Sequence, residues 1–201
     1  MQVMAGNTTA ESVSRLAVAA GVVQLIGLVS LIVFFIVGGP FGTLNDLCIG
    51  LTGLLSAALA WQLSAAFTAR PPALGWLMPA LAGLGALIVV VGSGLVITGT
   101  TGWVLAGLCT EFGYAWIGVW LLSFCLTPRV SAAWPRGLKG LGLVAGGLML
   151  LGVLTLPGLL RGLDAWEVLP WYVNVGQAGG LGWLLLYPLW CLWLGRFLAI
   201  R

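Results

Sequence analysis

Residues 103–126 read WVLAGLCTEFGYAWIGVWLLSFCL, and Glu111 is the only charged side chain in this apolar run. An α-helix needs about 20 apolar residues to cross a bilayer, so the run is long enough to span one. A carboxylate at that depth costs on the order of 3 kcal/mol, and such residues are usually kept for a function. The stretch therefore predicts a membrane-spanning helix that carries a functional carboxyl group.

The composition of the whole chain supports the same interpretation. Hydrophobic residues make up 61% of the 201 residues and charged residues 6%, whereas a soluble domain has about 25% charged residues. At about 20 to 25 residues per span, the chain has room for about six helices and little else. The apolar runs lack the alternation that a β-barrel shows. We therefore predict an all-α integral membrane protein with a single domain over residues 1–201.

Six apolar runs are separated by breaks rich in Gly, Pro and Thr. The breaks include residues 38–43, 68–73, 98–102 and 128–137. The predicted spans are Leu16–Val37, Leu44–Phe67, Leu74–Ile97, Trp103–Leu126, Leu138–Leu160 and Gly176–Ile200. The chain is thus predicted to form one bundle of six membrane-spanning helices.

The distribution of basic residues predicts how this bundle lies in the membrane. Cytoplasmic loops carry an excess of Lys and Arg. If the N-terminus is cytoplasmic, only Arg161 falls on the outer side, and the inner side holds Arg15, Arg70, Arg129, Arg136, Lys139, Arg196 and Arg201. We therefore expect both termini to be cytoplasmic, and we expect the membrane to be the bacterial plasma (inner) membrane.

The net charge of +3 follows from this topology, so we expect no nucleic-acid partner. The partner expected first is the lipid bilayer itself. Arg129, Arg136 and Lys139 form a basic segment that would meet anionic headgroups. A docking site for a cytoplasmic protein at this segment, and assembly with membrane proteins or with further copies of the chain, are the alternatives.

Several classes of chemistry are disfavoured by residues that the sequence lacks. There is no histidine, no Walker A motif and no GxGxxG motif, which argues against His-dependent metal sites, Ser-His-Asp triads and nucleotide hydrolysis. We therefore predict no enzyme activity, no cofactor and no metal. The four cysteines all lie in predicted spans and are expected to be small buried or lipid-facing residues, namely Cys48, Cys109, Cys125 and Cys191.

The helical periodicity of residues 103–126 separates small residues from large ones. At 100° per residue, Glu111 shares its face with Gly107 and Gly118, and the nearly opposite face carries Trp116 and Trp120. Small residues allow neighbouring backbones to approach, whereas large aromatic side chains suit lipid. We therefore predict that Glu111 faces the interior of the bundle and that both tryptophans face lipid or an interfacial belt.

Three other predicted spans place a polar group on a face of small residues. These groups are Gln24, Asp46 and Gln177. At 1.5 Å per residue, Glu111 and Gln24 lie near mid-membrane and the others near the outer end. We predict a polar cleft that opens outward and closes near Glu111. The predicted binding residues are Glu111, Asp46, Gln24, Gln177, Asn45 and Asn174.

A purely structural role remains an alternative for each of these residues. Stripes of small residues pack helices with or without a cavity, and the glutamines can hydrogen-bond between helices. Asp46 and Asn45 can cap the N-terminus of their helix. Glu111 can be a protonated acid bonded to a neighbouring carbonyl group. These roles need no ligand.

The outer segment between the last two spans offers a further partner for the acidic residues. Arg161 can pair with Asp164, Asp46 or Glu111. Trp166, Trp171 and Tyr172 in the same segment suit either a lid over the bundle mouth or an aromatic anchor at the interface.

Prolines inside spans predict local irregularity. Pro79 and Pro188 each remove a backbone hydrogen bond and favour a kink, and Ser93 lies between two glycines near the outer end of its span. Broken helices often line transporter sites. These features weakly favour a binding site over a simple packed bundle.

In architecture alone, the six helices, the length, the cytoplasmic termini and the Ala17–Gly21 pair resemble the substrate-binding components of energy-coupling-factor vitamin transporters. The functional hypothesis is a membrane protein that binds or transports a small solute or ion, with proton linkage through Glu111. The alternative is a non-catalytic accessory subunit of a larger membrane complex. An enzyme acting on a lipid or a quinone has little support, because few polar groups share one depth.

Overall fold

The computed structural model describes residues 2–67 and 72–200, and it is 88% helical with no strand in this part of the chain. Six segments are long and apolar enough to cross a membrane: Ala10–Val37, Phe41–Ser64, Gly75–Ile97, Trp103–Cys125, Arg136–Leu160 and Trp171–Ala199. The predicted all-α class and the six candidate spans are therefore confirmed. Arg70 and Arg201, which entered the predicted charge asymmetry, lie outside the described residues.

The first four spans are continuous helices: α1 (Gln2–Val37), α2 (Phe41–Phe67), α3 (Pro72–Ile97) and α4 (Trp103–Cys125). Helix α1 begins well before the predicted start at Leu16. Its polar N-terminal turns gave no apolar signal, but Ser14 donates a hydrogen bond of 2.7 Å to the carbonyl oxygen of Gly195. Packing against the end of the chain therefore accompanies this longer helix.

The last two spans are interrupted, which the apolar pattern did not predict for residues 138–160. After the short helix α5 (Pro128–Ala133), the elements are α6 (Arg136–Leu150), the 3₁₀ helix η1 (Leu151–Thr155), α7 (Leu156–Leu160), the 3₁₀ helix η2 (Trp166–Val168), α8 (Trp171–Gln177), the π-helix η3 (Gly182–Leu186) and α9 (Tyr187–Ala199). The sixth span also begins earlier than the predicted Gly176, at Trp171. Each of the last two spans thus changes helix type along its length.

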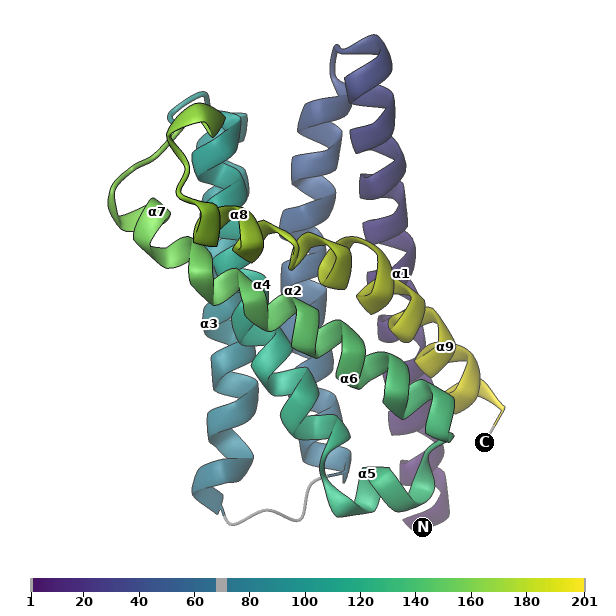
Figure 1. The fold of residues 1–201 in the computed structure, drawn as a ribbon. Coiled ribbons are helices and arrows are strands. Elements are labelled where there is room, and N and C mark those ends of the chain that lie inside the picture. The colour runs from purple at the N-terminus through teal and green to yellow at the C-terminus, as the bar shows by residue number, and fades with distance from the viewer. Residues whose placement is uncertain (1, 68–71, 201) are drawn as a thin grey trace.

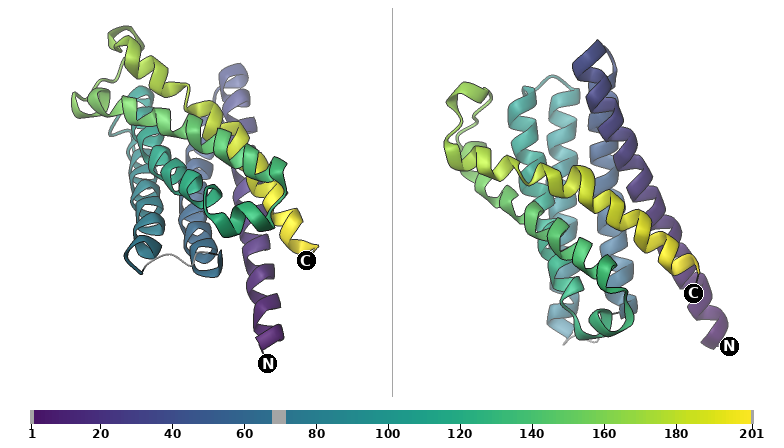
Figure 2. Two further views of the ribbon diagram at one scale, coloured as in Figure 1. Left: turned by 60° about the horizontal axis from the view of Figure 1, so that its bottom comes forward. Right: turned by 45° about the vertical axis from the view of Figure 1, so that its right-hand side comes forward.

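The spans form a closed ring. Helices α1 to α4 run side by side, and the segments α6–α7 and α8–α9 cross them obliquely (Figure 1, Figure 2). Helix α1 packs on α2 and α9, whereas α4 packs on α3 and α6. Both chain termini and α5 lie at one end of the bundle, which we call the α5 end (Figure 1). The turns 38–40 and 98–102 and the segment 161–170 lie at the opposite end (Figure 1).

Glycines allow the backbones of neighbouring helices to approach closely. A Cβ atom added at Gly113 of α4 would lie 2.7 Å from the carbonyl oxygen of Gly85 of α3. A Cβ atom added at Gly146 of α6 would lie 3.0 Å from the carbonyl oxygen of Gly118 of α4. Close approach through small residues is the usual way in which helices pack in lipid. Helix α4 is held on both sides in this way.

Aromatic side chains fill the bundle toward the α5 end. Trp120 packs against Trp190 and Phe124, with ring centroids 6.3 and 5.7 Å away, and Phe124 in turn contacts Trp134. Trp120 is fully buried and its indole N–H donates to Ser64 Oγ at 3.2 Å. The prediction that Trp120 faces lipid or an interfacial belt is therefore wrong, because α4 is enclosed by neighbouring helices on nearly every side.

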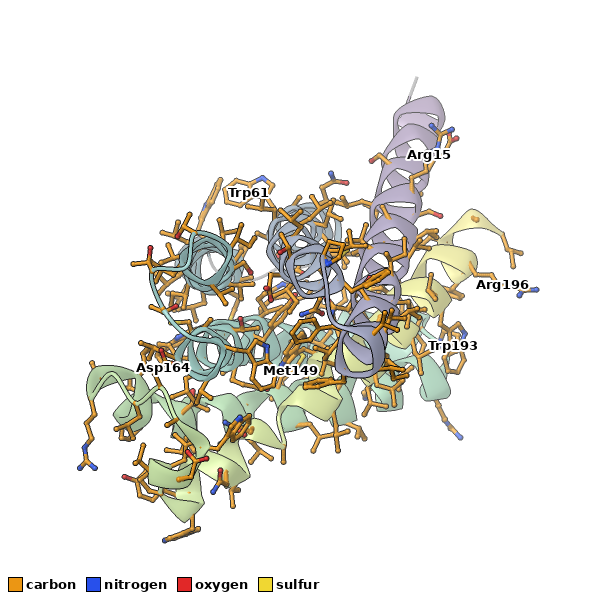
Figure 3. The ribbon with its side chains drawn as sticks, turned by 90° about the horizontal axis from the view of Figure 1, so that it is seen from above. Arg15, Trp61, Met149, Asp164, Trp193 and Arg196 are labelled. Atoms are coloured by element: carbon orange, nitrogen blue, oxygen red, sulfur yellow. The ribbon has the colours of Figure 1, made fainter. Side chains whose placement is uncertain are left out.

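Other side chains show the contrast between the interior and the outside of the bundle. Met149 is fully buried and lies inside the ring, whereas Trp61 and Trp193 project from its periphery (Figure 3). The exposed fractions of these two tryptophans are 50% and 43%. Arg15 and Arg196 also point away from the bundle (Figure 3). Many large apolar side chains are also exposed along the spans, which suits a lipid environment.

Candidate functional site

A cavity of about 300 Å³ occupies the half of the bundle that lies away from α5. Its walls come from α1, α2, α3, α4, η2, the end of α8, η3 and the residues between α8 and η3. The polar residues that line it are Asn45, Asp46, Ser93, Thr110, Glu111 and Gln177. The interior of the bundle is thus packed with aromatic rings at one end and hollow at the other.

Glu111 is the most buried acidic side chain of the cavity, with an exposed fraction of 7%. Its carboxyl group lies against the backbone of a glycine pair. A Cβ atom at Gly179 would be 3.1 Å from Oε2, and one at Gly180 would be 3.0 Å from Oε1. Oε2 is buried and has no hydrogen-bond partner in the described part of the chain. Such a buried, unsatisfied oxygen is costly unless something else bonds to it.

The sixth span is also irregular just after the glycine pair, and this irregularity has a local cause. In a regular α-helix the N–H of residue 188 would bond to the carbonyl of Leu184, but Pro188 has no N–H. The helix widens instead, and the Tyr187 N–H donates to the carbonyl oxygen of Gly182, five residues earlier. The irregularity predicted at Pro188 is therefore present. By contrast, α3 continues through Pro79 without interruption.

The fifth span is irregular at the same level of the bundle. η1 lies directly against α4, where Thr155 Oγ1 lies 3.1 Å from the carbonyl oxygen of Leu108 and 2.7 Å from that of Gly152, so its one proton is shared between two acceptors. Gly152 of η1 lies against the backbone carbonyl of Glu111. Pro157, which cannot donate to the carbonyl of Val153, follows this segment and marks the break in the sequence. Two interrupted spans therefore meet around the residue that carries the buried acid.

Aromatic rings surround the mouth of the cavity. Phe35 of α1 contacts Trp103 of α4, and Trp103 contacts Trp166 of η2, with ring centroids 5.7 and 5.6 Å apart. All three rings line the cavity and are partly exposed. Deeper inside, the ring of Trp183 stacks on Tyr114 at 4.7 Å with an interplanar angle of 2°. The cavity therefore combines acidic groups with an aromatic wall.

Four of the six predicted binding residues line the cavity: Glu111, Asp46, Asn45 and Gln177. Asn45 Nδ2 donates to Asp46 Oδ1 at 3.3 Å, and Asn45 Oδ1 has no partner among the described residues. The alternative that Asp46 and Asn45 cap their helix is wrong, because α2 already begins at Phe41. These two side chains point into the bundle from within the helix.

The structure places the other two predicted binding residues elsewhere. Gln24 is fully buried and does not line the cavity, and its Oε1 lies 3.4 Å from the hydroxyl group of Tyr114. The same hydroxyl lies 3.2 Å from the carbonyl oxygen of Ile49, so its one proton is shared between two acceptors. Asn174 is exposed on α8 and does not line the cavity. Helical projection predicted which face of its helix each residue occupies, but it could not predict how far the cavity extends along the bundle.

Arg161 does not pair with any of the three acids proposed for it within the described residues. It is exposed, whereas Asp164 has a different role. The Asp164 carboxylate accepts hydrogen bonds from the backbone N–H groups of Gly102 and Leu105, at 2.5 and 2.9 Å. Asp164 therefore caps α4 from a distant segment, where a negative charge also suits the helix dipole (Figure 3).

Several cavity residues were not among the predicted set. Ser93 and Thr110 are buried in its wall, and Ser93 Oγ has no partner in the described chain. The glycines on either side of Ser93 were a visible signal, but they were interpreted only as an irregularity. Trp166 lines the mouth, whereas Trp171 is 76% exposed and lies outside it. The aromatic segment thus contributes one residue to the cavity.

Comparison with models of protein families, with curated proteins and with solved structures finds no match to this chain. The architectural resemblance noted from the sequence therefore gains no support. Function has to be inferred from the cavity itself and from the side chains that line it.

Proposed function

We propose that this protein binds a small solute or ion in the cavity beside Glu111 and moves it across the membrane. The observation that carries this proposal is the buried carboxyl group itself, with an unbonded oxygen, in the wall of a cavity of about 300 Å³. Ligand pockets of small molecules begin at about this volume. Intramembrane acids are costly and are usually retained where they bind ions or relay protons.

Proton linkage is the expected mode of action of Glu111. A carboxyl group within a membrane span is a common proton-exchange site, and a ligand or water that enters the cavity can exchange a proton with it. The ionised form attracts a cation, and protonation releases it. The breaks at η1 and at residues 178–181 flank this carboxyl group and offer the places where spans can bend.

The orientation in the membrane is part of the proposal. The start of α6, with Arg136 and Lys139, and the end of α9, with Arg196, lie toward the α5 end, and the segment that begins at Arg161 lies at the opposite end (Figure 1). The positive-inside rule then makes the α5 end cytoplasmic, with the cavity in the outer half of a bacterial plasma membrane. Arg136 and Lys139, with Arg129, would meet anionic headgroups on the inner side.

Thiol accessibility tests whether solutes reach the cavity. Gly107 lines it, and a Cβ atom added there has open space around it. In a chain whose four cysteines are replaced by alanine, Gly107→Cys should react with a polar, membrane-impermeant thiol reagent added from the outer side. Ser56→Cys is the matched control, because Ser56 is fully buried and does not line the cavity. Equal lack of reaction at both positions would contradict the proposal.

A transport assay in proteoliposomes tests the role of the acid. We expect Glu111→Gln to abolish pH-dependent uptake while the protein is still produced and inserted. Glu11→Gln makes the same chemical change at the exposed end of α1, where Glu11 pairs with Arg15, and should have no effect. If Glu111→Gln retains full activity and the protein instead purifies with partner subunits in fixed ratio, the accessory-subunit alternative is correct.

A further inference from the structure

The charged side chains that line the cavity are all acidic. Asp46 and Glu111 both line it, and no lysine or arginine does so among the described residues. The one ion pair in this part of the chain joins Glu11 to Arg15 in α1, remote from the cavity. Buried carboxylates without a counter-charge are strongly disfavoured. A ligand that brings its own positive charge would remove that cost.

The hydrogen-bonding groups of the cavity point to the same kind of ligand. Glu111 Oε2 and Asn45 Oδ1 are buried acceptors without a donor in the described chain, and they come from different helices. Carboxylate and amide oxygens can only accept hydrogen bonds, so their missing partners are donors. Ser93 Oγ, which also lacks a partner, adds a third polar atom from α3, and the indole N–H of Trp183 adds an unbonded donor close to the Glu111 carboxyl group. A group with several N–H bonds satisfies such an arrangement.

The aromatic wall distinguishes an organic cation from a small inorganic one. Phe35, Trp103 and Trp166 form a continuous series of ring contacts at the mouth, and Trp183 lies deeper. The faces of aromatic rings attract cations and also pack against apolar groups. The volume of about 300 Å³ is far larger than a single bare ion fills. Both features favour a ligand with an apolar body.

We infer that the ligand is a protonated amine with an apolar substituent, bound with its nitrogen between Glu111 and Asp46 and its apolar part against Trp103 and Trp166. This inference rests on the proposed function, because it names the class of solute that the same cavity takes. The polar atoms form the inner part of the site and the aromatic rings form its outer part.

Phenethylammonium is a suitable first probe, because it joins one ammonium group to one aromatic ring. Two molecules of nearly the same size serve as comparisons: 2-phenylethanol, which is neutral, and phenylacetate, which is an anion. Binding to the detergent-solubilised full chain is measured by titration calorimetry. We expect saturable binding of the amine, weaker binding of the alcohol and none of the anion.

Substitutions then assign the contacts. Glu111→Gln should weaken amine binding by at least about tenfold, as expected for a lost buried charge pair. Asp46→Asn should weaken it as well, which keeps the test decisive if one of the two variants is poorly produced. Trp103→Leu should weaken it about two- to fivefold. Glu11→Gln and Trp61→Leu, which change residues outside the cavity, should leave it unchanged.

Failure of this inference differs from failure of the proposed function. If the alcohol binds as tightly as the amine and neither acidic substitution matters, the cavity takes a neutral solute and the amine assignment is overturned. If instead an inorganic cation alone binds, the assignment is likewise overturned. If no probe binds and Gly107→Cys is not modified, the cavity is closed to solutes and the proposed function falls with it.

Discussion

The backbone carbonyl of Glu111 lies where a side chain at Gly152 would begin. This contact brings the irregular part of the fifth span against the middle of α4, at the level of the buried acid. Because a hydrogen atom is all that fits there, the position of the Glu111 backbone depends on the residue at 152. The contact therefore links helix packing directly to the geometry of the candidate site.

Gly152→Ala should lower the free energy of unfolding by about 1–3 kcal/mol, because overpacking at a rigid backbone contact forces the two segments apart. Thermal unfolding in a mild detergent measures the loss. Gly147→Ala in α6 is the matched control, since a Cβ atom there meets nothing within 4 Å. In an open helical position alanine is no worse than glycine, so equal losses in both variants would contradict the packing argument.

Asp164→Ala should destabilise the protein by about 1 kcal/mol, the usual effect of removing a side chain that caps a helix N-terminus. Asp164→Asn should be milder, since the amide oxygen can still accept one of the two hydrogen bonds. Hydrogen exchange at the amides of Gly102 and Leu105 reports the loss locally. Glu167→Ala changes an exposed acid in the same segment. In this variant both amides should remain as protected from hydrogen exchange as in the unchanged protein.

Trp120→Phe should cost about 1 kcal/mol or more, because it removes the hydrogen bond to Ser64 and part of a fully buried ring. Trp193→Phe provides the comparison, since Trp193 is 43% exposed on the outer surface of α9. The melting temperatures of the two variants in detergent measure the two losses of stability. A larger loss for Trp193→Phe would show that the aromatic core is not where the structure places it.

Binding of an amine in the cavity should strengthen as the pH rises through the range in which the carboxyl groups lose their protons. The sign follows from charge, because a carboxylate attracts the cation and the protonated acid does not. Titration of the binding constant of phenethylammonium between acidic and slightly alkaline pH measures the dependence. In Glu111→Gln the dependence should be much flatter. An unchanged pH profile in this variant would assign the titrating group to Asp46 or to another acid.

Gly107→Val should reduce ligand binding with little effect on stability. Gly107 lines the cavity, and its Cβ position is open, so the new side chain fills ligand space without displacing protein atoms. Calorimetric binding and thermal unfolding are measured on the same preparation. Loss of both together would show that the space beside Gly107 is part of the packed fold.

The sequence predicted the helical class, the six candidate spans and the burial of Glu111, because hydropathy and helical periodicity depend only on the order of side chains. The prediction that the same periodicity gave for Trp120 was wrong. Projection assumes that one face of a helix meets lipid, and α4 is surrounded by α3, α6 and η1. A residue on the expected lipid face was therefore inside the core.

The cavity depended on tertiary structure. Asp46 and Gln177 lie in spans far apart in the chain, and Gln177 shares a cavity with Asp46 and Glu111 only because the sixth span crosses the first four. The capping of α4 by Asp164 likewise joins residues with no local pattern in common. Local order along the chain determines which side chains a helix presents. Which of them share a hollow depends on where helices break and cross, and those positions are set by backbone contacts between segments distant in sequence.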